Sequence, residues 1–374
     1  MPPKVDNIYN KLNIIIQLDK PSETVRAGTR LSGDLIIHAT ETVRAGRLQV
    51  FLEGNENATI ESNVQVRRGD RCRRSHKEAH SNHRILTLEG DLVGEEEIIR
   101  NGSIHSGTHE VPFEIDIPVS IPSSFAVQEE SNTGAVVYCL RAVLNGTTLE
   151  TRYPIHIAAQ TETIPDVPYV LQPKAQRIAS GFAFGKGKVI YGVKLPFTDF
   201  YRGQRPELQL SIINDSSVAV ESIRMTLRQV GALSTRKQNT TFTKDLCTVT
   251  LPQKAVNRIL LIKQDLGDRP KSTRNIRQSM MSQLDCEAMG RQSCWNLPAI
   301  PKSARNTYEG SIVSVKHEIV VQMQTEGDYT NPEFVVPVRI VPGRASSSFQ
   351  KRLSNSTAST ASSSCRALIE SRYY

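Results

Sequence analysis

Apolar and polar residues alternate along many short segments of the chain. The alternating apolar positions of the first two such segments are Leu12, Ile14, Ile16 and Leu18, and then Leu48, Val50 and Leu52. A period of two is typical of a β-strand that buries one face. Glycine, proline and asparagine stand between these segments, as turns between strands require. The pattern therefore predicts short, half-buried strands joined by turns.

The second half of the chain repeats this order of segments. Its matched apolar positions are Val189, Tyr191, Val193 and Leu195, and then Ile223, Met225 and Leu227. The turn glycines Gly28 and Gly203, which lie 175 residues apart, occupy the same place in the two halves. A repeat of this length indicates a duplicated domain. We therefore predict an all-β fold of two tandem immunoglobulin-like antiparallel β-sandwich domains.

The internal repeat, together with a change in composition after Pro342, divides the chain into four parts. We place the first sandwich at 1–158, a linker at 159–180, the second sandwich at 181–342 and a tail at 343–374. The tail segment 345–364 holds eleven Ser and Thr residues and few large apolar ones. Such a segment cannot bury enough surface to offset the entropy of ordering, so we expect the tail to be disordered.

The segment 111–125, VPFEIDIPVSIPSSF, combines strand alternation with prolines at 112, 118 and 122. Proline gives no N–H to a sheet, so it is confined to edge strands, strand starts and bulges. We predict a strand at the edge of its sheet, with Pro118 and Pro122 facing solvent and Phe113 in the core. The segment 297–303 is its expected counterpart in the second domain.

Several motifs, taken in order, resemble the arrestin superfamily and most closely the alpha-arrestins. They are GDLIIHA at 33–39, LQVFLEGN at 48–55, GTHEVPFEIDIP at 107–118 and YRGQRPELQLSIINDSS at 201–217. The resemblance implies a non-enzymatic cytoplasmic adaptor that links membrane-protein cargo to endocytic, sorting or ubiquitination machinery. An alternative with the same fold is a cargo-binding subunit of a sorting coat, similar to that of retromer.

The charge of the chain, +8 overall, is concentrated in one segment. Residues 66–84 hold seven basic residues against two acids: Arg67, Arg68, Arg71, Arg73, Arg74, Lys77 and Arg84. Arginine suits phosphate and carboxylate groups, so the segment is a candidate site for a phosphorylated cargo tail, an anionic membrane or the chain's own tail. We expect the segment to project as a long loop between strands of the first domain. A solvated hairpin loop without a partner is the other interpretation. Aromatic residues make up only 6% of the chain, which disfavours nucleic-acid binding.

The same segment carries the sharpest candidate for metal chemistry. Cys72, His76, His80 and His83 are possible zinc ligands, but arginines surround them and would repel a cation. The chain lacks GxSxG, GxxxxGK[ST] and a strand-linked GxGxxG motif. We therefore expect no catalytic residues, no bound metal and no cofactor.

The resemblance also implies roles for individual residues. Arg152 and Asp285 could form a buried charge pair that an incoming phosphate breaks, as in visual arrestins, and Cys247 or Cys294 could form a mixed disulfide, as in some relatives. Buried, inert cysteines are the other interpretation. KRLS offers Ser354 as a phosphorylation site.

The recruitment motif of many alpha-arrestins is missing from this sequence. Pro-Pro-x-Tyr does not occur, so the sequence does not support a WW-domain ubiquitin ligase as partner. No apolar run reaches the length of a membrane span. We expect a cytoplasmic protein that can bind peripherally at the plasma membrane or endosomes.

Overall fold

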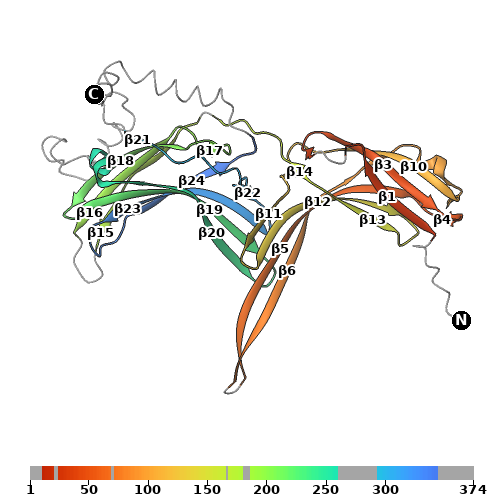
Figure 1. Cartoon of the computed structure of the whole chain (residues 1–374), viewed down its shortest axis with the longest axis horizontal. Coiled ribbons are helices and arrows are strands. Elements are labelled where there is room, and N and C mark those ends of the chain that lie inside the picture. The colour runs from red at the N-terminus through yellow and green to blue at the C-terminus, as the bar shows by residue number, and fades with distance from the viewer. Residues whose placement is uncertain are drawn as a thin grey trace, which may run out of the picture. The chain divides into compact units, whose positions relative to one another are not determined.

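The computed structural model describes most of the chain as short antiparallel strands (Figure 1). The described residues are 11–20, 24–68, 71–165, 167–179, 186–259 and 293–343, and within them the side chains of 63–68, 71–76, 257–259 and 293 are not described. The chain forms two compact units. Unit 1 comprises 1–160, 231–242 and 308–314, and unit 2 comprises the other residues.

Unit 1 contains two main sheets. The first has the order β1 (Leu12–Leu18), β3 (Arg30–Ala39), β10 (Gly107–Asp116) and β7 (Asp91–Leu92). The second has the order β11 (Phe125–Glu129), β12 (Asn132–Leu144), β5 (Leu48–Arg68) and β6 (Arg71–Glu89), with β13 (Glu150–Ile155) also paired to β12.

Short elements complete unit 1. They are the parallel pair β2 (Val25–Arg26) and β14 (Ile157–Ala158), the set β4 (Val43–Arg44), β9 (Ser103–Ile104) and β8 (Ile99–Arg100), and helix α1 (Glu95–Ile98).

Unit 2 is built from a second pair of sheets. One has the order β15 (Tyr169–Ile178), β16 (Gly187–Leu195), β18 (Glu207–Ser216) and β21 (Ser293–Asn296). The other has the order β17 (Asp199–Phe200), β24 (Glu333–Ile340), β23 (Val313–Thr325), β19 (Val220–Ser234) and β20 (Asn239–Leu251), with β22 (Tyr308–Glu309) on β23. The adjoining ends of β19, β20, β22 and β23 belong to unit 1. Helix α2 is Gln253–Ile259.

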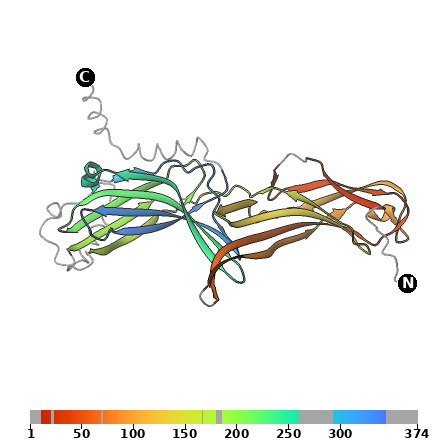
Figure 2. The ribbon, with the colours of Figure 1, turned by 60° about the horizontal axis from the view of Figure 1, so that its bottom comes forward.

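The predicted alternation fills the cores. Strand β1 alternates strictly between buried and exposed residues, with Ile14 paired to Ile37 and Ile16 to Leu35 on β3. Apolar side chains from both sheets of unit 1 form one cluster, and those of unit 2 form another. The prediction of two antiparallel β-sandwiches is therefore confirmed (Figure 2). Neither helix among the described residues is long and apolar enough to cross a bilayer.

The proline-rich segment differs from the prediction. Phe113 is buried, as expected, but strand β10 ends at Asp116 and lies between β3 and β7. Pro118 and Pro122 fall in the irregular chain before β11, because two prolines so close together remove the N–H groups that further pairing needs. Most of the counterpart segment 297–303 is also irregular. The edge-strand prediction is therefore wrong for both domains.

Candidate functional site

The basic segment 66–84 belongs to the longest pair of strands in unit 1. Strand β5 pairs with β12 only as far as Thr59, whereas it pairs with β6 as far as Arg68 opposite Arg71. From Ile60 to Ala79 these strands therefore form a two-stranded ribbon, which we call the basic ribbon (Figure 1). The prediction of a long loop is wrong, because main-chain pairing continues as far as Arg68 opposite Arg71.

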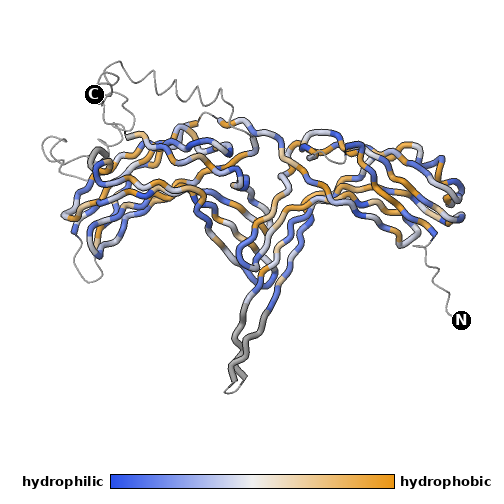
Figure 3. The backbone as a smooth tube through the Cα atoms, in the orientation of Figure 1, coloured by the Kyte–Doolittle hydropathy of each residue, from blue (hydrophilic) through white to orange (hydrophobic). Residues whose placement is uncertain are grey.

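The charges of the ribbon are close together along its backbone. Arg68 stands opposite Arg71, Arg67 opposite Cys72 and Gln65 opposite Arg74. The side chains of all five candidate arginines lie outside the described ones, so their contacts stay untested. Lys77 is exposed and has no ion pair within the described part of the chain. The coloured part of the tube that leads to this end is largely hydrophilic (Figure 3).

Arg84, the last candidate cation, is paired with a buried carboxylate of the protein. Its Nη1 donates to Glu53 Oε1 at 2.7 Å, and the same oxygen accepts from Arg141 Nε at 2.7 Å. The Glu53 side chain is 1% exposed, whereas that of Arg84 is 47% exposed. Arg141 also lies over the ring of Phe51, 4.9 Å from its centroid. Since a buried carboxylate needs such partners, Arg84 stabilises the base of the ribbon and is a poor candidate for ligand binding.

The histidine and cysteine positions do not suit a shared metal ion. Cys72, His76 and His80 are four residues apart on β6, and a strand rises about 3.3 Å per residue, so successive positions are about 13 Å apart. Zinc requires ligand atoms within about 2.3 Å of one centre. His80 Nδ1 instead lies 3.0 Å from Thr59 Oγ1, and His83 is exposed.

Arg152 occupies a different environment from that expected of a buried switch. It lies on β13, its side chain is 58% exposed, and its Nε donates to Glu150 Oε1 at 2.5 Å. This bond holds the pKa of Glu150 below its usual value. Asp285 and Ser354 lie outside the described residues. The pairing of Arg152 with Asp285 stays a prediction, but the exposure of Arg152 does not match a buried charge.

The two candidate redox cysteines have raised pKa values. Burial raises the pKa of the Cys247 thiol. Partial desolvation followed by the nearby Glu207 carboxylate raises the pKa of Cys294 to about 11, although Cys294 is exposed at the surface. Nucleophilic attack needs the thiolate, which a raised pKa disfavours. These environments favour inert thiols over a mixed-disulfide site.

Sequence reasoning missed the buried carboxylate of Glu56, which holds segment 308–314 within unit 1. Glu56 is 1% exposed and accepts hydrogen bonds from Tyr308 Oη, from Ser311 N at 3.3 Å and from Ile312 N at 2.8 Å. A Cβ at position 310 would overlap this carboxylate, so the close approach requires Gly310. No local sequence signal marks the contact, because Glu56 and Tyr308 are 252 residues apart.

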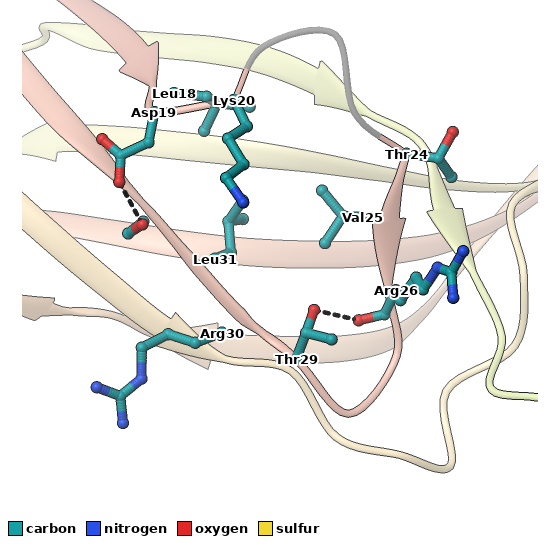
Figure 4. A pocket seen from close by; sticks show the side chains of 10 residues that line it. Leu18, Asp19, Lys20, Thr24, Val25, Arg26, Thr29, Arg30 and Leu31 are labelled. Carbon is teal, nitrogen blue, oxygen red and sulfur yellow. Dashed lines mark hydrogen bonds between the residues drawn. The ribbon is translucent and has the colours of Figure 1, made fainter.

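A cavity of about 290 Å³ lies where β1, β2 and β3 meet (Figure 4). Arg30 points away from it and is bound to Glu114 and Asp116, at 2.7 and 2.9 Å. Among the ten residues that line the cavity, Asp19 is the single acid, and it accepts a hydrogen bond from Ser32 Oγ. This lining lacks the paired acid and base of a hydrolytic site.

Comparison with protein families agrees with the architecture. Residues 14–163 match the family model "Arrestin (or S-antigen), N-terminal domain", and residues 185–343 match "Arrestin (or S-antigen), C-terminal domain". The chain therefore belongs to the arrestin superfamily. Proteins of this family are generally non-enzymatic, and its domains support an adaptor or scaffold role of the arrestin type.

Proposed function

We propose that this protein is an alpha-arrestin-type adaptor of the cytoplasm that binds phosphorylated cytoplasmic tails of membrane proteins through the basic ribbon. It would act as a peripheral protein at the plasma membrane or endosomes and connect cargo to endocytic or sorting machinery. Because Pro-Pro-x-Tyr is absent, any ubiquitin ligase would be engaged through another motif.

The observation that carries this proposal is the combination of charge and free strand edges in the basic ribbon. Segment 60–79 holds six basic residues against three acids. Beyond Thr59, β5 has β6 as its only strand neighbour within the described residues. An extended peptide can add to such an edge through main-chain hydrogen bonds, while arginines bind its phosphates through charge-assisted bonds. Both interactions favour an extended, phosphorylated ligand.

The tail supplies a candidate for regulation of the same ribbon. Phosphorylation of Ser354 would add a charge of about −1.5 to −2, which could compete with cargo for the basic residues. We also propose the pair of Arg152 and Asp285 as a second switch. For this pair to form, Asp285 would have to replace Glu150 beside Arg152.

The proposal can be tested by fluorescence anisotropy with the full chain and one doubly phosphorylated peptide. Changing Arg67, Arg68, Arg71, Arg73 and Arg74 to Ser should weaken binding about a hundredfold, because hydrogen bonds to charged groups contribute about 1.5–3 kcal/mol each and at least two would be lost. The unfolding temperature should stay nearly unchanged.

A matched control removes five exposed cations elsewhere that make no ion pair within the described residues. They are Arg26, Arg44, Lys174, Arg177 and Arg224. If this control loses as much affinity as the ribbon variant, net charge alone explains binding. If the ribbon variant binds acidic liposomes poorly but keeps its peptide affinity, the ribbon serves a membrane and the cargo proposal is wrong.

A further inference from the structure

Two loops of unit 2 are held together by main-chain hydrogen bonds. Gly203 N donates to Ile300 O at 2.9 Å, and Ile300 N donates to Gln204 O at 2.8 Å. Leu297 N also donates to Pro206 O at 2.9 Å. These bonds fix the loop before β18 against the loop that follows β21, so the side chains of the two loops start from defined positions.

The first loop turns tightly at residues 201–204. Gln204 N donates to Tyr201 O at 3.1 Å, and the side-chain Oε1 of Gln204 accepts from Tyr201 N at 2.6 Å. Gly203 has a φ of +88°, which other residues rarely adopt. The turn therefore presents Arg202 from a constrained backbone.

Basic residues gather on both loops without acidic partners. Arg202 and Arg205 lie on the first loop, and Lys302 and Arg305 lie on the second. Within the described part of the chain none of the four makes an ion pair, although other arginines of unit 2 do: Arg228 bonds Asp245 at 3.1 Å and Arg339 bonds Asp199 at 3.0 Å. The loops thus carry four cations that the described residues leave unneutralised.

Arg202 is partly buried, whereas the other three cations are exposed. Its burial lowers its pKa, with the neighbouring Arg305 guanidinium lowering it further. Two cations that repel each other at a partly dehydrated position cost free energy unless an anion lies between them.

A second unsatisfied group lies in the same turn. Gln204 is 3% exposed, and its Nε2 has no hydrogen-bond acceptor among the described residues. A buried donor without an acceptor costs about 1–3 kcal/mol. The turn therefore combines surplus positive charge, which a bound oxyanion would offset, with a buried donor that lacks an acceptor among the described residues.

We propose that Arg202 and Arg305 form a binding site for a phosphate monoester group. Each guanidinium can bond two oxygens in parallel, and a monoester supplies three strong acceptor oxygens with a charge of about −1.5 to −2, close to that of the arginine pair. A carboxylate offers one charge and two oxygens, which leaves one guanidinium partly unbalanced. The site lies in unit 2 and is independent of the basic ribbon.

Isothermal titration calorimetry of the full chain with inorganic phosphate tests the site. We expect one phosphate to bind per chain, with affinity at least tenfold weaker in Arg202→Gln and in Arg305→Gln. Arg224→Gln is the control, because Arg224 is exposed on β19 and makes no ion pair with a described residue. Absence of binding, or equal affinity in all four proteins, would overturn the proposal.

The unfolding temperature separates a lost site from a damaged fold. In phosphate-free buffer Arg202→Gln should unfold no lower than the wild type, because the substitution removes a repelled charge. Added phosphate should raise the unfolding temperature of the wild type but not that of the variant. A variant that is destabilised without phosphate would show that Arg202 has a structural role, which contradicts the proposal.

Vesicles distinguish a soluble ligand from a lipid headgroup. Phosphatidic acid carries a monoester phosphate and phosphatidylglycerol a diester, so the two can be compared at equal surface charge. A preference for phosphatidic acid that Arg202→Gln abolishes supports the site with a lipid ligand. Phosphate binding without that preference supports the site with a soluble ligand. If the protein shows neither phosphate binding nor that preference, the proposal is refuted.

Discussion

Removing the Glu56 carboxylate should free segment 308–314 from its place in unit 1. In Glu56→Ala, the amide of Ile312 loses an acceptor at 2.8 Å, that of Ser311 one at 3.3 Å, and Tyr308 Oη loses its acceptor as well. A hydrogen bond to a charged group contributes about 1.5–3 kcal/mol, and the long Ser311 bond should contribute least. Allowing for partial relaxation and entering water, the loss is about 3 kcal/mol.

Native-state hydrogen exchange measures this loss at the residues concerned. A local destabilisation of about 3 kcal/mol corresponds to about a hundredfold faster exchange of the Ile312 amide, if exchange occurs by local opening. Glu56→Gln keeps one acceptor oxygen and should fall between the wild type and the alanine variant. Glu110→Ala removes an exposed carboxylate of β10 and should leave Ile312 unchanged.

An Ile312 exchange rate in Glu56→Ala within about threefold of the wild-type rate, which corresponds to less than about 1 kcal/mol, would contradict this expectation. The carboxylate would then be dispensable, and the apolar contacts of this segment would hold it in place. One such contact is the edge-to-face pair of Phe125 and Tyr308, whose centroids are 5.3 Å apart.

Three further substitutions test the cores and the charge pairs. Phe113→Ala should cost about 3–5 kcal/mol in a denaturant titration, since the ring is 1% exposed, and a loss below about 1 kcal/mol would contradict that burial. Arg152→Ala should change stability by less than about 1 kcal/mol because its pair with Glu150 is exposed, so a loss of several kcal/mol would revive a buried switch. Burial lowers the pKa of His317 to about 4, below its unfolded value, so stability should be complete above about pH 6.5 and fall by up to about 3 kcal/mol as the pH drops toward 4. His317→Gln should remove that slope, and an unchanged slope would assign it to other groups.

The alternation of apolar residues was sufficient to predict the sandwiches. Ile14 and Val193 are buried where a period of two places them, because burial of one sheet face depends on local order alone. The far part of β6 escaped prediction as strand, because its sequence RCRRSHKE shows no apolar alternation. The segment with Pro118 and Pro122 gave the opposite error, because its apolar pattern continues past the end of strand β10 at Asp116.

The charged contacts could not be predicted because their partners are distant in sequence. Glu53 and Glu56 both lie in a polar stretch of β5 that resembles exposed strand. Glu53 is paired to Arg141, 88 residues away. The surplus charge on the loops at Arg202 and Arg305 is likewise visible only once the fold brings the two loops together.

Photo-crosslinking tests most directly the claim that the basic ribbon receives a phosphorylated tail. A phosphorylated peptide with a photoreactive group would be irradiated with the full chain, and the attached residues located by mass spectrometry. We expect crosslinks concentrated between residues 60 and 79, and we expect them to disappear when the five ribbon arginines are changed to Ser. Crosslinks that fall elsewhere in the chain and persist in that variant would contradict the claim.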